Sequence, residues 1–229
     1  MMDKKTMDDI VEWDCVNWSR AIAFWDRYLG NIDVHGMKVL DIGGRNGGLS
    51  LYWALKGAQV LCTDLREKEF ENAKHLHRKY CVDQQVVYRQ LDVLELKEVD
   101  EYDIVTFKSV MGGVGGGDNF RNQRKMVENI FSAIKPGGYC VCAENLVGSL
   151  LHMWLRKKFR PWSDNWRYID IDEFKQLFNI FCELHIETYG FLGTLGQGRF
   201  LDICSMIDTL FDKWMGDSNK YIVSCVARK

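Results

Sequence analysis

The residues best suited to bind a ligand form a glycine-rich turn at positions 43–48 of the 229-residue chain. The turn follows the apolar run "MKVLDI", which contains Asp41, and it precedes the apolar stretch "LSLYWAL". Glycine reaches positive φ angles and has no side chain to block a ligand, so the backbone can approach a bound molecule closely. A glycine turn directly after a buried strand is typical of cofactor sites in α/β proteins.

The spacing of the glycines argues against two common ligands. A phosphate-binding Walker loop needs a lysine followed by serine or threonine at a fixed distance, and neither Gly43 nor Gly44 has one. The dinucleotide pattern GxGxxG needs a glycine where Arg45 or Asn46 stands. A YxxxK pair, typical of short-chain dehydrogenases, occurs at 52–56, but it directly follows the turn and is interpreted as a coincidence. A nicotinamide oxidoreductase is therefore disfavoured.

Strands and helices alternate along the chain, which predicts a mostly parallel sheet with helices on both faces. Apolar runs predict strands at 37–42, 58–65, 85–93, 101–110, 139–145, 183–190 and 220–229. Periodic apolar positions predict helices at 47–57, 67–80, 119–134 and 171–181. No linker or internal repeat divides the chain, so residues 1–229 are expected to form a single domain.

One amphipathic helix is expected at residues 8–30, before the first strand. Its apolar positions recur at intervals of four and three, namely Val11, Cys15, Trp18, Ile22, Trp25 and Leu29. We expect Trp13 and Trp18 to pack in the core, with a lid over the site as the alternative. Two longer stretches, 145–168 and 190–219, are expected as insertions that form a substrate cap together with this helix.

The stretch around the glycine turn resembles the first motif of the class I S-adenosylmethionine-dependent methyltransferases, which runs roughly DxGxGxG. It matches at Asp41, Gly43 and Gly47 and departs at Arg45, where the family has glycine. The acidic strand ends, "AIKPGGYCVCAE" and the last two strands follow the family's order from about residue 37 to 229. The resemblance implies a Rossmann-like three-layer α/β sandwich with a mostly parallel seven-stranded sheet and an antiparallel last strand.

The resemblance also implies how S-adenosylmethionine binds. The glycine turn holds its amino-acid and ribose parts, and Asp64, 21 residues after Gly43, accepts hydrogen bonds from the ribose hydroxyls. Leu65 lies beside the adenine, Asp92 meets the adenine amino group, and Val93 is next to Asp92. The expected cofactor-binding residues are Asp41, Gly43, Gly44, Arg45, Gly47, Asp64, Leu65, Asp92, Val93, Lys108 and Ser109.

Methyl transfer needs positioning above all, and a hydroxyl acceptor also needs a base. Glu144, at the end of a predicted strand, is the first candidate base and His152 the second. Lys108 and Ser109, at the end of the fourth strand, are expected to line the cofactor or acceptor pocket. The glycine run 112–117 predicts a mobile loop, with a phosphate nest as the alternative. Of the other histidines, His35, His75 and His77 are expected at the surface and His185 in the core.

The segment "LLHMWLRKKFRPW", residues 150–162, joins an apolar stretch to four cations within five residues. It is interpreted either as a helix that covers the site with a solvated basic end, or as an interfacial segment that touches anionic lipid or a diphosphate-linked acceptor. Trp154, Trp162 and Trp166 suit a sugar-stacking wall or a membrane interface. Peripheral membrane contact through 150–162 is thus one of two interpretations.

The composition of the chain limits the kinds of partner and the location that are expected for the protein. The net charge of −2 gives no general attraction to nucleic acid, so no nucleic-acid partner is expected. The first residues are acidic and polar, unlike a signal peptide, and the longest uncharged stretch, 145–155, is too short to span a bilayer. The eight cysteines contain no CxxC pair, which favours reduced thiols and no metal site. A cytoplasmic protein is expected.

The favoured function is O-methylation of a small or carrier-linked acceptor. A saccharide or glycolipid intermediate is the preferred class, because of the aromatic and basic segment and a resemblance to bacterial polysaccharide-cluster methyltransferases. The alternatives are a protein or RNA methyltransferase and a non-catalytic cofactor-binding subunit. The sequence leaves the oligomeric state undetermined.

Overall fold

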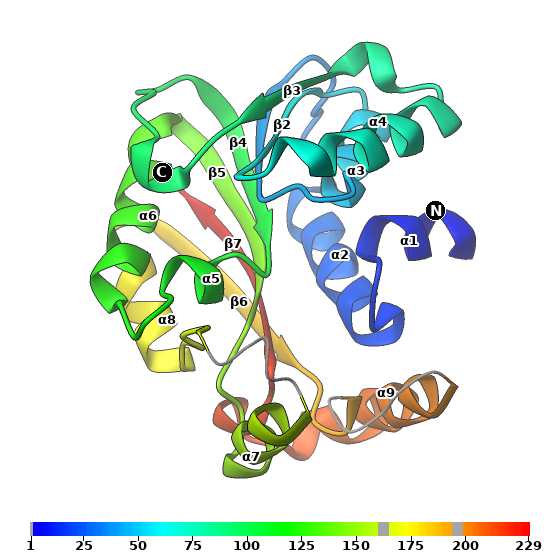
Figure 1. Cartoon of the computed structure of the whole chain (residues 1–229), viewed down its shortest axis with the longest axis vertical. Helices are drawn as coiled ribbons and strands as arrows, with labels where there is room; N and C mark the ends of the chain where they lie inside the picture. The colour runs from blue at the N-terminus through cyan, green and yellow to red at the C-terminus, as the bar shows by residue number, and fades with distance from the viewer. Residues whose placement is uncertain (1, 160–164, 194–198) are drawn as a thin grey trace.

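The computed structural model describes residues 2–159, 165–193 and 199–229. A seven-stranded sheet with the order β3-β2-β1-β4-β5-β7-β6 organises the chain (Figure 1). All its strands are parallel except β7, which runs antiparallel to both of its neighbours. The predicted sheet with an antiparallel last strand is therefore confirmed. The strands are β1 Lys38–Ile42, β2 Gln59–Asp64, β3 Val86–Gln90, β4 Tyr102–Lys108, β5 Ile134–Asn145, β6 Glu183–Tyr189 and β7 Ile222–Arg228.

Helices cover both faces of this sheet (Figure 1). Residues alternate between the faces along each strand, so β4 sends Ile104 into one apolar core and Val105 into the other. One core lies under α1–α4 and the other under α5, α6 and α8. The helices are α1 Lys4–Val11, α2 Cys15–Leu29, α3 Gly48–Leu55, α4 Phe70–Lys79, α5 Met111–Val114, α6 Phe120–Ala133, α7 Leu150–Phe159, α8 Ile171–Phe178 and α9 Arg199–Phe211.

The prediction of one helix over residues 8–30 is wrong. The chain forms α1 and α2 and turns sharply between them at residues 12–14, here called the elbow. Glu12 (φ 69°) and Asp14 (φ 44°) adopt left-handed backbone conformations that interrupt helix geometry. The Asp14 carboxylate holds the turn, because Ser205 and Tyr221 both donate to it from the far end of the chain. The apolar period runs through the elbow, so periodicity alone predicts a continuous helix.

A glycine lets α1 lie directly against α3. A Cβ placed on Gly48 would lie 2.2 Å from the backbone oxygen of Ile10. Gly48→Ala is therefore expected to push α1 and the elbow outward and to lower the free energy of unfolding by about 1–3 kcal/mol. Urea denaturation measures the change. Gly113→Ala is the matched control, because its Cβ would meet nothing closer than 4.0 Å; equal stability of the two variants would contradict the prediction.

The two predicted insertions lie beyond the carboxyl end of the sheet (Figure 1). Stretch 145–168 contains α7, and 190–219 contains α9 and short 3-10 turns at Asp212–Trp214 and Asp217–Asn219; residues 160–164 and 194–198, with Trp162, lie outside the described residues. Buried carboxylates fasten α9 to α2: Asp208 accepts from the Asn17 amide at 3.1 Å. Asp212 accepts from Arg20 at 2.6 Å. That these stretches cap a substrate stays a prediction.

None of the described helices combines the length and hydropathy needed to cross a bilayer. The eight cysteines are free thiols, five of them buried. Cys140 and Cys142 lie in the same core, on one face of β5, as their spacing predicts.

Candidate cofactor and active site

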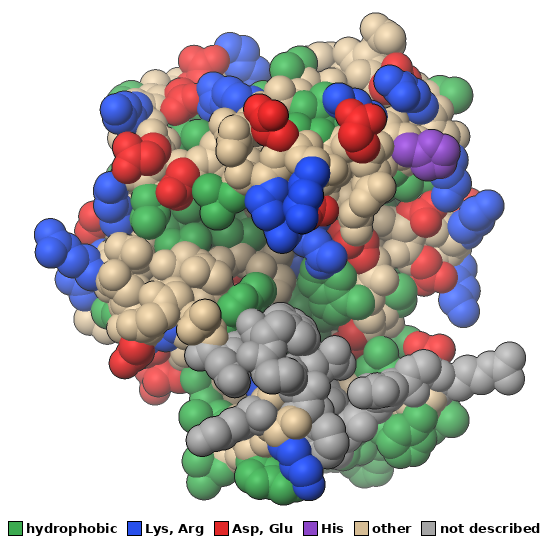
Figure 2. Space-filling model, viewed as in Figure 1, with side chains coloured by type: hydrophobic (Ala, Val, Ile, Leu, Met, Phe, Trp, Pro, Cys, Tyr) green, Lys and Arg blue, Asp and Glu red, His purple; other side chains and the backbone are tan. Residues whose placement is uncertain are grey.

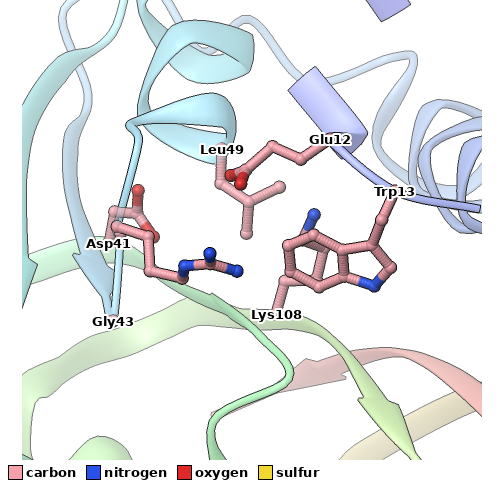
Figure 3. Close-up of a pocket in the computed structure, with 8 residues that line it drawn as sticks. Glu12, Trp13, Asp41, Gly43, Leu49 and Lys108 are labelled. Carbon is pink, nitrogen blue, oxygen red and sulfur yellow. The ribbon is translucent and has the colours of Figure 1, made fainter. Parts of the chain in front are cut away.

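The carboxyl ends of β1 and β4 meet the elbow around a small cavity (Figure 3). In the close-up Glu12 and Trp13 lie on one side of it and Asp41 lies opposite, while Lys108 lies against the Trp13 ring. Two strands, one glycine turn and the N-terminal segment thus line a single space. The lining residues are Glu12, Trp13, Asp41, Gly43, Gly44, Arg45, Leu49 and Lys108.

Glycine is required at two positions of the turn for different reasons. Gly43 has a φ of 68°, which L side chains rarely adopt. Gly44 leaves no room for a side chain, since a Cβ would lie 2.7 Å from the Cys62 sulfur and 3.0 Å from Asp41 Oδ2. Its N–H donates to the Thr63 carbonyl at 2.7 Å, which fastens the turn to the end of β2. The turn therefore presents bare backbone to the cavity.

Behind the turn lies a histidine that was expected at the surface. His77 is fully buried: its Nε2 lies 2.9 Å from the Gly47 oxygen and its Nδ1 lies 2.7 Å from the Tyr88 hydroxyl. Burial lowers its pKa. The prediction that His77 lies at the surface is wrong. The apolar spacing of α4 allows either Leu76 or His77 to face inward, and His77 is the one that is fully buried. The prediction that His185 lies in the core is wrong as well, because His185 is exposed and stacks on Tyr28.

Arg45, the departure from the family motif, takes the left-handed conformation (φ 43°) that a glycine would adopt there. Its N–H donates to Asp64 Oδ2 at 3.2 Å, which draws the acid toward the turn. Its guanidinium lies 5.3 Å from the centre of the Trp13 ring. The arginine thus keeps the backbone path of the turn and adds a cation that contacts the elbow.

Asp41 is buried, and its two carboxylate oxygens differ. Oδ2 accepts a hydrogen bond from the Ser50 hydroxyl at 2.6 Å, whereas Oδ1 has no hydrogen-bond partner in the protein. Burial raises the pKa of this carboxyl to about 7. A buried acceptor without a partner is costly, so it fits a ligand that carries a donor. The ammonium group of S-adenosylmethionine is such a donor, and Asp41 lines the cavity.

The acids predicted for the adenosine lie at neighbouring strand ends. Asp64 is nearly buried and accepts from the N–H groups of Arg45 and, at 3.0 Å, Arg66. A carboxylate has about four lone-pair positions, so two remain for the ribose hydroxyls. Leu65 beside it is 59% exposed and offers an apolar surface. At the end of β3, Asp92 accepts from the Leu94 N–H at 2.9 Å. These residues fit the adenosine half of the cofactor, while Val93 is buried in the core beneath.

Lys108, the last residue of β4, reaches into the cavity toward the elbow. Its Nζ donates to the Val11 carbonyl and lies 3.7 Å from the centre of the Trp13 ring. Burial lowers the pKa of this amine to about 8, although Glu12 opposes the shift. The neighbouring Ser109 has a φ of 59° and accepts a hydrogen bond from the Asn145 amide. Of the two residues, Lys108 lines the cavity.

Neither predicted base reaches the cavity. Glu144 Oε2 accepts from the N–H groups of Val110 and Met111, both at 2.7 Å, and its Oε1 accepts from the Asn145 N–H at 2.8 Å. Burial raises its pKa to about 7, and the carboxylate holds the first turn of α5. His152 is fully buried. Its Nδ1 accepts from the Ser149 N–H at 2.8 Å and its Nε2 lies 2.7 Å from the Phe191 oxygen.

The prediction of a loop at 112–117 is wrong for residues 112–114, which lie within α5. Two of the glycines allow close packing: a Cβ on Gly112 would lie 2.5 Å from the Trp166 ring, and one on Gly115 would lie 2.6 Å from the Gln123 amide. The predicted mobility of the run stays a prediction.

The elbow supplies wall residues that the sequence did not assign to the site. Glu12 Oε2 accepts from the Asn46 amide of the glycine turn at 2.9 Å, so the elbow and the turn are directly bonded. Trp13 lies between Arg45 and Lys108 as an aromatic wall and also packs against the core in which Trp18 is buried, so the expected core packing of these tryptophans is confirmed. That Trp13 belongs to a lid stays a prediction. The sequence did contain a signal for these wall residues: an acid, a tryptophan and an acid follow one another at residues 12–14, inside an otherwise amphipathic pattern.

A family model described as a methyltransferase domain matches residues 33–188. The chain belongs to this methyltransferase family. The resemblance seen in the glycine turn is therefore confirmed, and with it the enzyme class and its cofactor, S-adenosylmethionine. The cavity of this methyltransferase lies where the turn of the family motif meets the elbow.

Two curated relatives of the methyltransferase are ubiquinone biosynthesis O-methyltransferases. The protein from Leptothrix cholodnii is 31% identical over 116 residues, which is 50% of this chain and 46% of the relative. The protein from Acinetobacter baylyi is 32% identical over 139 residues, 52% of this chain and 56% of the relative. The chain thus matches about half the length of these relatives.

A solved structure shows the same fold. Phosphoethanolamine N-methyltransferase 2 of Haemonchus contortus, solved in complex with S-adenosyl-L-methionine, superposes with a TM-score of 0.66 at 18% sequence identity. The match covers 93% of this methyltransferase and 52% of the other chain. At this identity the likeness concerns the fold, and it extends over nearly all of the chain.

Proposed function

We propose that this methyltransferase transfers a methyl group to an oxygen atom of a small or carrier-linked acceptor. The O-methyltransferase relatives support oxygen as the target, although each matches over about half of its length. The observation that carries the proposal is the cavity itself. It brings the unpartnered carboxylate oxygen of Asp41, the glycine turn and a lysine with a lowered pKa together around one small cavity.

The chain's own residues divide the binding between two regions. Asp41 and the bare backbone of Gly43 and Gly44 would hold the amino-acid part of the cofactor. Asp64 would hold the ribose hydroxyls, and Asp92 would meet the adenine. When bound, S-adenosylmethionine supplies an activated methyl group. Trp13 and Glu12 line the cavity on the side of the elbow, where they would limit the access of water to the reacting atoms.

We assign the proton acceptor to Lys108. An acceptor hydroxyl must lose its proton as its oxygen bonds to the methyl carbon, and a neutral amine at the end of β4 can take that proton. With a pKa of about 8, part of the Lys108 population is neutral near neutral pH. The proton would move to Lys108 Nζ. Glu144 and His152 have their acceptor atoms bonded elsewhere.

Lys108→Gln is expected to lower kcat by about 10²–10⁴, because the base is lost while the binding residues remain. The wild-type rate should rise with pH and level off above about pH 8, since the amine is the base only when deprotonated, and this rise should disappear in the variant. Formation of S-adenosylhomocysteine from pH 6 to 9 measures both effects, with phenols and glycan hydroxyls tested as separate acceptor sets.

Lys56→Gln is the matched control, because Lys56 also lies over an aromatic ring, Tyr52, but outside the cavity. Calorimetry should give the same affinity for S-adenosylhomocysteine in both variants. A Lys108→Gln protein with the wild-type rate and pH profile would rule out the base. Saturable cofactor binding without turnover on any acceptor would instead favour a non-catalytic subunit.

A saccharide or glycolipid is the acceptor class that we propose within this function. The support is the aromatic and basic stretch that begins with α7, which follows β5 at the carboxyl edge of the sheet where the cavity also lies. Turnover of phenols but not of glycans would show that the acceptor class is phenolic, and the proposal of O-methylation would still stand.

A further inference from the structure

Exposed apolar side chains concentrate at one end of the molecule. Of the sixteen large apolar side chains that are exposed in the described ranges, ten lie in α7, α9 and the turn that follows α9. Single exposed apolar residues are ordinary, but a gathering of this size marks an interaction surface. The ten, here called the apolar face, are Leu150, Leu151, Met153, Trp154, Phe200, Ile203, Met206, Leu210, Phe211 and Trp214.

The helices that carry the apolar face are fixed by their inner sides. In α7, Arg156 is buried and donates to the carbonyls of Leu146 at 2.7 Å and Val147 at 2.9 Å. In α9, Asp208 is buried and accepts from the Leu192 N–H at 2.7 Å. Buried polar side chains on the inner sides thus bond both helices to the rest of the fold. The exposed apolar side chains point outward from a firmly attached support.

Both helices lie at the same end of the sheet. They follow β5 and β6, which run in the same direction, and Figure 1 places α7 and α9 together beyond the sheet. In Figure 2 apolar side chains gather along the lower rim, over these helices. The glycine turn after β1 opens at this same carboxyl edge. The apolar face is thus on the side of the molecule from which an acceptor would enter.

Cations accompany the tryptophans of the apolar face. Lys158 Nζ lies 4.8 Å from the centre of the Trp154 ring, and Lys213 Nζ lies 4.3 Å from that of Trp214. Tryptophan favours the boundary between lipid tails and headgroups, and lysine beside it binds anionic headgroups. α7 contains no acid, and of its cations Arg156 is buried and bonded inward. Of the three acids in α9 and the turn after it, Asp208 and Asp212 are buried and bonded inward, and Asp202 is exposed.

We propose that the apolar face is a docking surface for a lipid bilayer that contains anionic lipids. Apolar side chains enter the outer layer of the membrane, and the lysines hold its phosphate groups. The docking requires no particular acceptor. Its significance for catalysis rests on the proposed function, because a lipid-linked or carrier-linked acceptor would then meet the enzyme at the edge of the sheet that contains the cavity.

Sedimentation with vesicles tests the proposal on the full chain. The wild-type protein should pellet with vesicles of phosphatidylcholine and phosphatidylglycerol at 3:1, at least about tenfold more strongly than with phosphatidylcholine alone, and less at high salt. Trp154→Ser combined with Trp214→Ser should lower the partition coefficient about tenfold or more. Val87→Ser combined with Val99→Ser is the matched control, because both valines are exposed away from the apolar face.

Three outcomes would overturn the proposal. One is wild-type protein that stays in solution with every vesicle, and another is an equal loss of binding in the control pair. The third is a dimer, seen by sedimentation equilibrium, that Trp154→Ser with Trp214→Ser converts to a monomer, since a second copy would then occupy the apolar face. Calorimetry with S-adenosylhomocysteine accompanies each variant. Intact ligand binding without vesicle binding would reject the docking surface and leave the proposed function standing.

Discussion

Replacing Asp64 with alanine is expected to raise the Kd for S-adenosylhomocysteine by about a hundredfold. Two ribose hydroxyls would each lose a hydrogen bond to a carboxylate, and such bonds contribute about 1.5–3 kcal/mol apiece. A hundredfold change corresponds to about 2.7 kcal/mol, so one or two bonds account for it. The acid also receives the N–H of Arg45, which means that the turn loses an anchor in the same variant. Isothermal titration calorimetry at pH 7.5 measures the change.

Two further variants separate binding from folding. Asp64→Asn keeps one acceptor oxygen for the backbone N–H groups, so it should retain more stability than alanine while still binding weakly. Asp172→Ala, an exposed acid in the first turn of α8, should bind as the wild type does. An unchanged Kd in Asp64→Ala would contradict the placement of the ribose at this acid.

Asp41→Asn is expected to stabilise the protein at pH 8 and to weaken its binding of S-adenosylhomocysteine. Burial raises the pKa of Asp41 to about 7 from its ordinary value of 3.8. Between about pH 4 and 7 the folded state therefore holds more protons than the unfolded state, and the free energy of unfolding falls as pH rises. Asparagine does not titrate, so the variant should gain on the order of 2–4 kcal/mol above pH 7 and nothing below pH 4.

Urea unfolding of wild type and variant at pH 5 and pH 8 measures this gain. Glu144 has a raised pKa as well, but both proteins share it, so their difference isolates Asp41. Ligand binding should weaken instead. The Kd for S-adenosylhomocysteine should rise about tenfold or more, because its ammonium group loses a charged partner. A variant that is both less stable and weaker in binding would show that Asp41 only supports the turn.

Sequence patterns predicted the parts of this site that backbone geometry creates. Strand ends, glycines and the acid at the end of β2 follow local rules, since parallel strands bring their carboxyl ends to one edge. The identity of the general base could not be predicted from such local rules. Glu144 and His152 stand at suitable positions along the chain, but the direction of each side chain is decided by partners distant in sequence. A carboxylate that faces a ligand and one that holds a helix start look alike in a sequence.

The elbow is a second feature that depends on partners distant in sequence and was therefore not predicted. An unbroken apolar period concealed a turn whose cause is Asp14, and the partners of that acid lie 191 and 207 residues further on. Lys108 was expected near the pocket because it ends β4. Its lowered pKa was not predictable, since it comes mainly from burial by residues distant in sequence, with the nearby charge of Arg45 as a smaller cause.

The bonds from Asp14 to Ser205 and Tyr221 have a consequence for the order of assembly during synthesis. The elbow forms one wall of the cavity, yet the groups that hold it are synthesised 191 and 207 residues after Asp14. Contacts of such long range form late, because a long loop must close before they contribute. A nascent chain can complete the glycine turn and the first strands while the elbow still lacks its anchor. Capacity to enclose the cofactor therefore arises only when β7 joins the sheet.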